Sequence, residues 1–158
     1  MRAQADDPRM THHQLSPIPP PETATDPVRS CFDLQERWRA LMGPLGFGQR
    51  LLWVGFLGPD RCLVKTLGQV PIGSRPRARI MKILMSSLRT RLDDMASGTT
   101  VTLLLTGPGR GPISPNDRLW AKVLTDIADR FAVPLERIFR ANDESLDPVE
   151  VLAPRPDC

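Results

Sequence analysis

The chain of 158 residues is 41% hydrophobic and 25% charged, with a formal net charge of +3. This composition supports one domain with a core and leaves no room for two large ones. Its longest apolar runs, Val101–Leu105 and Leu51–Leu57, are far shorter than the roughly 18 residues that a membrane-spanning helix needs. The first residues lack the apolar segment of a secretory signal peptide. We therefore expect a cytoplasmic protein without a membrane partner.

Cysteine and proline usage indicate how the chain is organised. Cys31, Cys62 and Cys158 make an odd number without a Cys-x-x-Cys spacing, so free thiols are predicted rather than a disulfide framework or a zinc knuckle. Six prolines and few large apolar residues between positions 1 and 28 predict a disordered arm, because such a segment cannot offset its chain entropy. A single α/β domain over 29–153 and a tail over 154–158 are expected to follow.

The first half of the chain predicts a helix followed by a β-hairpin. Ser30 and Asp33 form a Ser-x-x-Asp capping signature, which predicts a helix over 31–42. Two apolar runs, 49–57 and 62–70, flank a Gly-Pro-Asp-Arg turn cluster, the pattern of two paired strands.

A second helix and a buried strand come next. Pro76 suits the first turn of a helix that runs to about Met95. Its apolar residues step by three and four and predict a core-facing stripe of Met81, Met85, Leu88, Leu92 and Met95. The β-branched and apolar run 99–106 predicts a buried strand.

The last third of the chain completes the fold class. Ser114, Pro115 and Asp117 provide an N-cap, a proline at the first position and an acid at the third, which predicts a helix that Pro134 ends. Short strands are expected over 137–141 and 149–153. The order of elements predicts an α/β sandwich of two or three layers, with a mixed sheet flanked by helices.

The glycine-rich loop 107–114 is the first candidate site. A strand, a glycine-rich loop and a capped helix start together form a geometry that holds anions. The P-loop and Rossmann patterns both fail here, because Pro112 stands where glycine or a tight turn is needed. Two interpretations stay open: a tight loop with an ordinary cap, or an enzyme that holds a phosphorylated ligand through Arg110.

A family resemblance appears at the same loop. Leu103–Pro108, read LLLTGP, followed by Ser114, Pro115, Asn116 and Asp117, resembles the motif region of the RadC-type branch of the JAB (MPN) metalloprotease superfamily. That family carries His-x-His-Pro at the end of a strand and Ser-x-x-Asp at the start of the next helix. The resemblance covers about residues 49–153 and implies the same order of hairpin, helix, strand and helix. The chain is also similar to short uncharacterised proteins of actinobacteria.

The chain departs from that family at the metal site. Leu105 and Gly107 stand where the family has two zinc-binding histidines, and neither residue can bind zinc. The hairpin also holds no glutamate to serve as the family's catalytic residue. The motif residues that remain are Pro108, Ser114 and Asp117. The resemblance therefore implies a domain with no catalytic residue, metal or cofactor.

The second candidate site is a basic stripe. Arg75, Arg79, Lys82 and Arg89 fall at helical spacing on one face of the predicted helix. Such a stripe tracks a nucleic-acid backbone in some proteins and is a solvated helix face in many others. No aromatic residue interleaves with these cations, which argues against stacking on single-stranded nucleic acid.

The sequence thus predicts a non-catalytic domain that binds a macromolecule, with a protein as the first-ranked partner. The predicted contact residues are Arg75, Arg79, Lys82, Arg89 and Arg110. The alternatives are a nucleic-acid-binding regulator that uses the basic helix 75–89, and a phosphate-ligand enzyme that uses the loop 107–114. The sequence carries no signal of oligomerisation.

Overall fold

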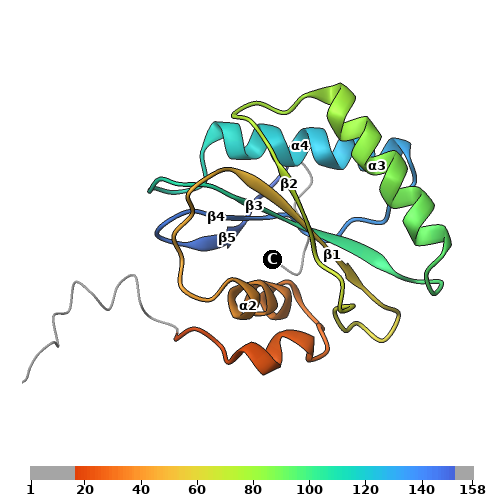
Figure 1. Ribbon diagram of the computed structural model, residues 1–158, viewed down its shortest axis with the longest axis horizontal. Helices are drawn as coiled ribbons and strands as arrows, with labels where there is room; N and C mark the ends of the chain where they lie inside the picture. The colour runs from red at the N-terminus through yellow and green to blue at the C-terminus, as the bar shows by residue number, and fades with distance from the viewer. Residues whose placement is uncertain (1–16, 152–158) are drawn as a thin grey trace, which may run out of the picture.

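The structure, a computed structural model, describes residues 17–151 and shows the α/β fold that the sequence predicts. A five-stranded sheet lies between α2 on one face and α3 and α4 on the other, so the molecule has three layers (Figure 1). The elements are η1 (Pro21–Thr25), α2 (Cys31–Met42), β1 (Leu51–Leu57), β2 (Gly68–Pro71), α3 (Ala78–Asp93), β3 (Thr100–Thr106), α4 (Pro115–Arg130), β4 (Phe139–Ala141) and β5 (Leu146–Pro148).

The sheet is mixed, as expected, with the strand order β2-β1-β3-β4-β5. β1 pairs antiparallel with β2 and β3, and β4 pairs antiparallel with β5. β3 and β4 are parallel, with Leu105 beside Arg140, and α4 is the crossover that parallel neighbours require. The carboxyl ends of β3 and β4 therefore lie at one edge of the sheet, next to the loop that leads into α4.

Two hydrophobic clusters join the layers. On one face, Met85 of α3 and Trp120 of α4 belong to the larger cluster. On the other face, Trp38 of α2 and Phe139 of β4 belong to a smaller cluster. The predicted stripe on α3 is confirmed: Met81, Met85, Leu88 and Leu92 are buried and Met95 is partly buried against the same cluster.

Two of the three α-helices begin at a residue whose side chain caps the helix. Ser30 Oγ accepts a hydrogen bond from the Asp33 amide, and Ser114 with Asp117 forms a reciprocal capping box. α3 begins two residues after Pro76 and has Arg77 at its N-cap, with no hydrogen bond from a capping side chain. The start of α3 therefore lacks the local stabilisation that the other two helices have.

Of the predicted strands, the one over 137–141 forms as β4, whereas the second strand of the hairpin and the last strand differ from their expected ranges. The hairpin is confirmed, but the run predicted over 62–70 forms a ladder with β1 only over Gly68–Pro71. Before it, Leu63 makes a single bridge to Leu57, and the Thr66 amide bonds locally to the carbonyl of Val64 instead of to a neighbouring strand. β5 forms over 146–148 rather than 149–153. The side chain of Asn142 accepts hydrogen bonds from the amides of Glu144 and Ser145, which reverses the chain directly after β4 and starts the pairing early.

The N-terminal boundary of the domain also differs from the prediction. Of the arm expected over 1–28, residues 21–25 form η1, and Ala24 and Val28 are buried. The Val28 amide donates to the carbonyl of Arg61 at 2.8 Å, which joins this segment to the hairpin turn. Residues 1–16 and the predicted tail 154–158 lie outside the described residues.

The cysteines only partly match the prediction. Cys62 is a free thiol, as expected. Cys31 is disulfide-bonded, which contradicts the prediction from spacing, because spacing along the chain does not report which cysteines fold together. Cys158 lies outside the described residues. No helix within residues 17–151 is long and apolar enough to cross a lipid bilayer.

Candidate functional site

Arg89 separates from the other three members of the predicted basic stripe. Its guanidinium donates to the carbonyl of Ala132, just beyond α4, and pairs with Asp93 at 2.9 Å. Arg89 therefore connects α3 to the end of α4, and its charge is paired with that of Asp93.

The remaining cations gather at the start of α3. Arg79 and Lys82 lie on α3, Arg77 is its N-cap, and Arg75 lies on the connection before it. All four are exposed, and their side chains have no hydrogen bond or ion pair within residues 17–151. Side chains of α4 hold this connection in place, since Asn116 and Trp120 both donate to the carbonyl of Ser74.

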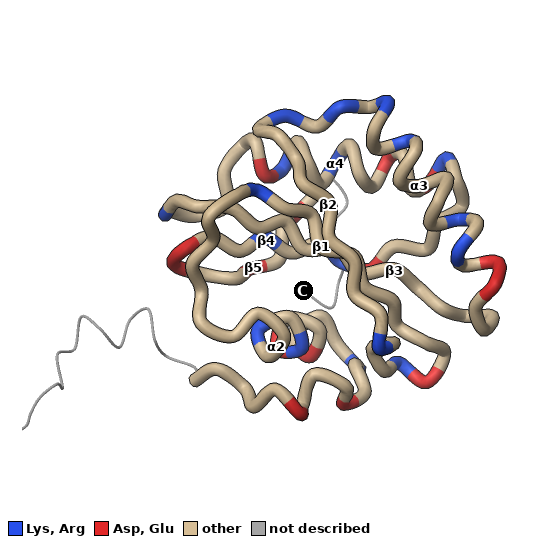
Figure 2. The backbone as a smooth tube through the Cα atoms, viewed as in Figure 1, with Lys and Arg blue, Asp and Glu red and all other residues tan. Residues whose placement is uncertain are grey.

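The charged residues in this part of the sequence are all positive over a long segment. Between positions 61 and 92 the chain has eight Lys and Arg residues and no Asp or Glu. Figure 2 shows the blue segments following one another along the connection from β2 to α3 and along α3 itself. The net charge of the whole chain is only +3, so this segment is the strongest concentration of one sign in the sequence.

The start of α3 is also an unfavourable place for cations. The N-terminus of a helix carries a partial positive charge, which acids stabilise and bases destabilise. The first turn of α3 contains no acid, and Arg77 at the N-cap offers no acceptor for the free amides. Arg75, Arg77 and Arg79 thus surround the positive end of the helix.

Two exposed isoleucines share this part of α3. The exposed fractions are 43% for Ile80 and 59% for Ile83. Ile83 follows Arg79 by four residues, so the two side chains are neighbours on the helix. We use the name α3 surface for Arg75, Arg77, Arg79, Ile80, Lys82 and Ile83.

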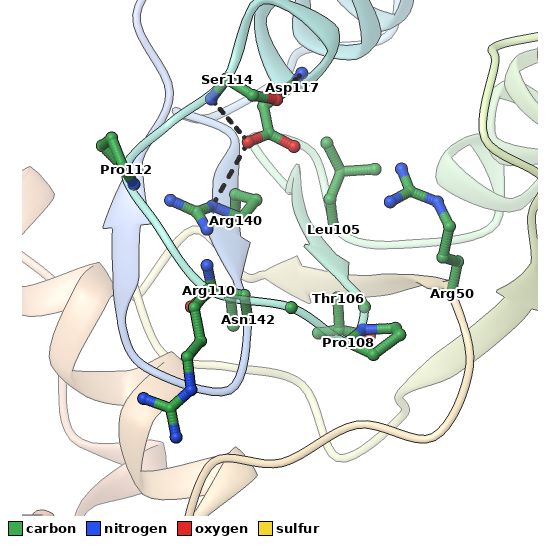
Figure 3. A pocket seen from close by; sticks show the side chains of 13 residues that line it. Arg50, Leu105, Thr106, Pro108, Arg110, Pro112, Ser114, Asp117, Arg140 and Asn142 are labelled. Carbon is green, nitrogen blue, oxygen red and sulfur yellow. Dashed lines mark hydrogen bonds and ion pairs between the residues drawn. The ribbon is translucent and has the colours of Figure 1, made fainter.

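The loop 107–114 borders a pocket of about 150 Å³ at the carboxyl ends of β3 and β4. The residues that carry the family resemblance come together here, because Leu105, Gly107, Pro108, Ser114 and Asp117 all line this pocket. Figure 3 shows Ser114 and Asp117 at the helix end of the pocket and Pro108 at the strand end.

Acidic side chains from the β4–β5 turn accept hydrogen bonds from backbone amides of the loop. Asp143 accepts from the Gly109 amide and Glu144 accepts from the Gly111 amide, at 2.9 and 2.8 Å. The bonds from Gly109 and then Phe47 hold the pKa of the Asp143 carboxyl below its ordinary value. Two of the amides that a bound phosphate would use are therefore already satisfied within the domain.

Arg110 lies at the edge of this arrangement. Its side chain is 74% exposed and lies 3.8 Å from the Glu144 carboxylate. In Figure 3 its guanidinium points away from Ser114 and Asp117. The structure thus gives Arg110 a surface position beside an acid rather than a place inside the pocket.

Arg140 is the pocket residue that sequence reasoning missed. Its side chain is 6% exposed, its Nε lies 3.6 Å from Asp117, and it reaches the pocket from β4. Figure 3 shows it pointing toward Asp117. A signal was present, because an arginine within a predicted apolar strand is rarely buried without a specific partner.

Within the described part of the chain, no group of three or more His, Cys, Asp or Glu residues is placed to hold a metal ion. No family model matches the chain, and comparisons with curated proteins and with solved structures give no match. The resemblance to RadC-type JAB domains therefore stays a prediction that rests on the motif residues in the pocket.

Proposed function

We propose that this protein is a non-catalytic cytoplasmic binding domain whose α3 surface docks on an acidic partner protein. The observation that carries the proposal is the crowding of Arg75, Arg77 and Arg79 around the uncapped positive end of α3. This arrangement lowers the stability of the helix, and no acid among residues 17–151 pairs with these side chains. An anionic surface that binds there would offset that unfavourable charge.

The isoleucines favour a protein over a nucleic acid. Ile80 and Ile83 are exposed beside the cations, and burial of apolar side chains at the centre of a charged rim is typical of protein interfaces. A surface that only follows a phosphate backbone needs cations and polar groups there, not two isoleucines. The α3 surface therefore fits a partner with acidic residues around an apolar patch.

The resemblance to the JAB superfamily is compatible with this proposal. A RadC-like domain with Leu105 and Gly107 at the histidine positions would keep the fold and lose the zinc site. The proposed function needs no cofactor and no catalytic residue, so it follows from the surface alone.

The test begins with a photo-crosslinking amino acid at Ile83 of the full chain, irradiated in nuclease-treated extract of the native host. The cross-linked protein is identified, purified and titrated against wild type and against the double variant Arg79→Glu, Lys82→Glu. We expect charge reversal to weaken binding more than about tenfold, because it places like charges across the interface. The matched control is Arg130→Glu, an exposed arginine at the far end of α4, which should bind as wild type does.

Two results would overturn the proposal. One is a partner that binds the double variant as tightly as wild type. The other is a duplex DNA that binds wild type and not the double variant, with a slope of about −3 or steeper when the logarithm of its association constant is plotted against the logarithm of the salt concentration. That dependence indicates phosphate contacts. The second result would show that the α3 surface binds nucleic acid.

A further inference from the structure

The pocket beside the loop 107–114 contains a buried charge that the domain does not fully satisfy. Arg140 lies on the face of β4 that turns toward α4, next to Leu105 on β3. Most neighbouring side chains on this face belong to the larger hydrophobic cluster. A guanidinium in such a place needs partners for its five N–H groups, because burial of an unpaired charge is costly.

The partners present are few and distant. Arg140 Nε has no hydrogen-bond partner, and the nearest carboxylate oxygen, Oδ2 of Asp117, is 3.6 Å away. The two Nη atoms share one acceptor, the carbonyl of Gly111, at 3.3 and 3.4 Å. These distances exceed the usual range of about 2.7–2.9 Å for charge-assisted bonds.

Asp117, the nearest carboxylate, is held by the cap of α4. Its Oδ2 atom already accepts from the Ser114 amide at 2.9 Å, as part of the capping box that starts α4. The carboxylate is therefore shared between the helix end and Arg140. Because Arg140 Nε is buried, the Nη atoms, whose bonds to the Gly111 carbonyl are long, are the donors that can serve a ligand in the pocket.

A second cation lines the same pocket. Arg50 donates through Nε to the carbonyl of Gly73, which leaves the Nη end of its guanidinium near Gly107. Figure 3 shows Leu105 between Arg140 and Arg50, with both side chains at the pocket wall. Against these two guanidinium groups the pocket wall holds one carboxylate, Asp117, so its inner part has a net positive charge.

We propose that this pocket binds a small tetrahedral oxyanion, a phosphate group, with Arg140 as the buried anchor and Arg50 as the second contact. A planar guanidinium donates in parallel to two oxygens of such an anion, and the N-terminus of α4 favours negative charge at the same place. The site differs from the one expected from sequence, because Arg110 and the amides of Gly109 and Gly111 face Asp143 and Glu144. It is also independent of the α3 surface, since the two share no residue.

The probe is inorganic phosphate, titrated into the full chain at constant ionic strength and followed by calorimetry and by amide chemical shifts. We expect one site with a dissociation constant of about 1 mM or tighter, and a loss of about tenfold or more in Arg140→Gln. The matched control is Arg110→Gln, a pocket-edge arginine that should leave the affinity unchanged. The largest changes in amide chemical shift should fall on residues 105–117 and 140–142.

Several results would overturn the proposal. They are the absence of saturable binding to wild type, equal affinity in Arg140→Gln, or shift changes confined to residues 75–83, which would place phosphate on the α3 surface. If Arg140→Gln does not fold, Arg50→Gln decides, because this partly exposed residue can be replaced without opening the core. Wild-type affinity in a folded Arg50→Gln variant would then count against the site.

Discussion

Arg61 and Glu136 form a two-point ion pair across 75 positions of sequence, with Nη1–Oε2 at 2.8 Å and Nη2–Oε1 at 3.3 Å. The Thr100 hydroxyl donates to the same Oε2 atom at 2.7 Å, and Arg61 Nε donates to the carbonyl of Val28. The pair therefore joins the turn of the hairpin, the start of β3, the approach to β4 and the N-terminal segment. The backbone of Arg61 has a φ of 66°.

Glu136→Gln should lower the free energy of unfolding by about 1 kcal/mol, because it removes the charge from a geometrically good, partly buried pair. Urea denaturation measures the change. The control is Asp126→Asn on α4, which weakens a more exposed pair with Lys122 and should change the stability by less than about 0.5 kcal/mol. Equal effects of the two substitutions would show that the Arg61–Glu136 pair is no stronger than a surface pair.

Thr102→Val should lower the free energy of unfolding by about 1–3 kcal/mol. The Trp38 indole donates to the Thr102 hydroxyl at 2.9 Å, and both residues are buried, so valine would leave the indole N–H without an acceptor. Thr106→Val is a close comparison, because Thr106 accepts from the Trp53 indole at 3.0 Å. Trp53 is partly exposed, so water can replace that bond and the loss should be smaller. A larger loss at Thr106 would contradict this account of α2 docking.

Arg77→Ser should raise the free energy of unfolding by about 1 kcal/mol, because serine supplies the missing cap and removes a cation from the positive end of α3. The same variant should bind the partner of the α3 surface more weakly. Thermal denaturation and a binding titration on one protein preparation test both effects. Arg130→Ser is the counterpart at the last turn of α4, where a cation is favourable, so no stabilisation is expected there. A destabilised Arg77→Ser variant would remove the main support for the proposed function.

Asp143→Asn should remove a pH-dependent part of the stability. The folded-state pKa of Asp143 is lowered by the hydrogen bonds from Gly109 and Phe47, so the carboxylate stabilises the fold fully above the ordinary aspartate pKa of about 4. That contribution is lost as the pH falls through the lowered pKa. The difference between wild type and variant in urea midpoint should therefore shrink between about pH 6 and about pH 3. Asp147→Asn in β5, whose side chain accepts no hydrogen bond from residues 17–151, should show no such trend. A constant difference for Asp143→Asn would contradict the role assigned to its two amide contacts.

The parts of the fold predicted well are those that neighbouring residues decide. Ser30 and Ser114 each cap a helix through a contact three residues away, and the stripe from Met81 to Leu92 follows from helical spacing alone. β1 and β3 were predicted because long apolar runs between glycine-rich turns have few other structures available.

The parts predicted poorly depend on contacts between distant positions. β5 starts early because the Asn142 side chain closes a turn, and residues 21–28 fold because Val28 binds Arg61. In the candidate site, the sequence correctly predicts the contact between Ser114 and Asp117. It names Arg110, and not Arg140, as the arginine that would hold a ligand at the loop. The burial of Arg140 and the capture of the loop amides by Asp143 and Glu144 arise only when β4 pairs with β3.

The sequence by itself determined the α/β class, the caps of α2 and α4 and the basic character of α3, because each depends on residues within a few positions of one another. Only the tertiary structure decided which charges stay unpaired. Burial and pairing are properties of groups brought together from distant segments. They leave Arg77 and its neighbours without an ion pair on the surface, and they leave Arg140 in the pocket with one carboxylate at 3.6 Å.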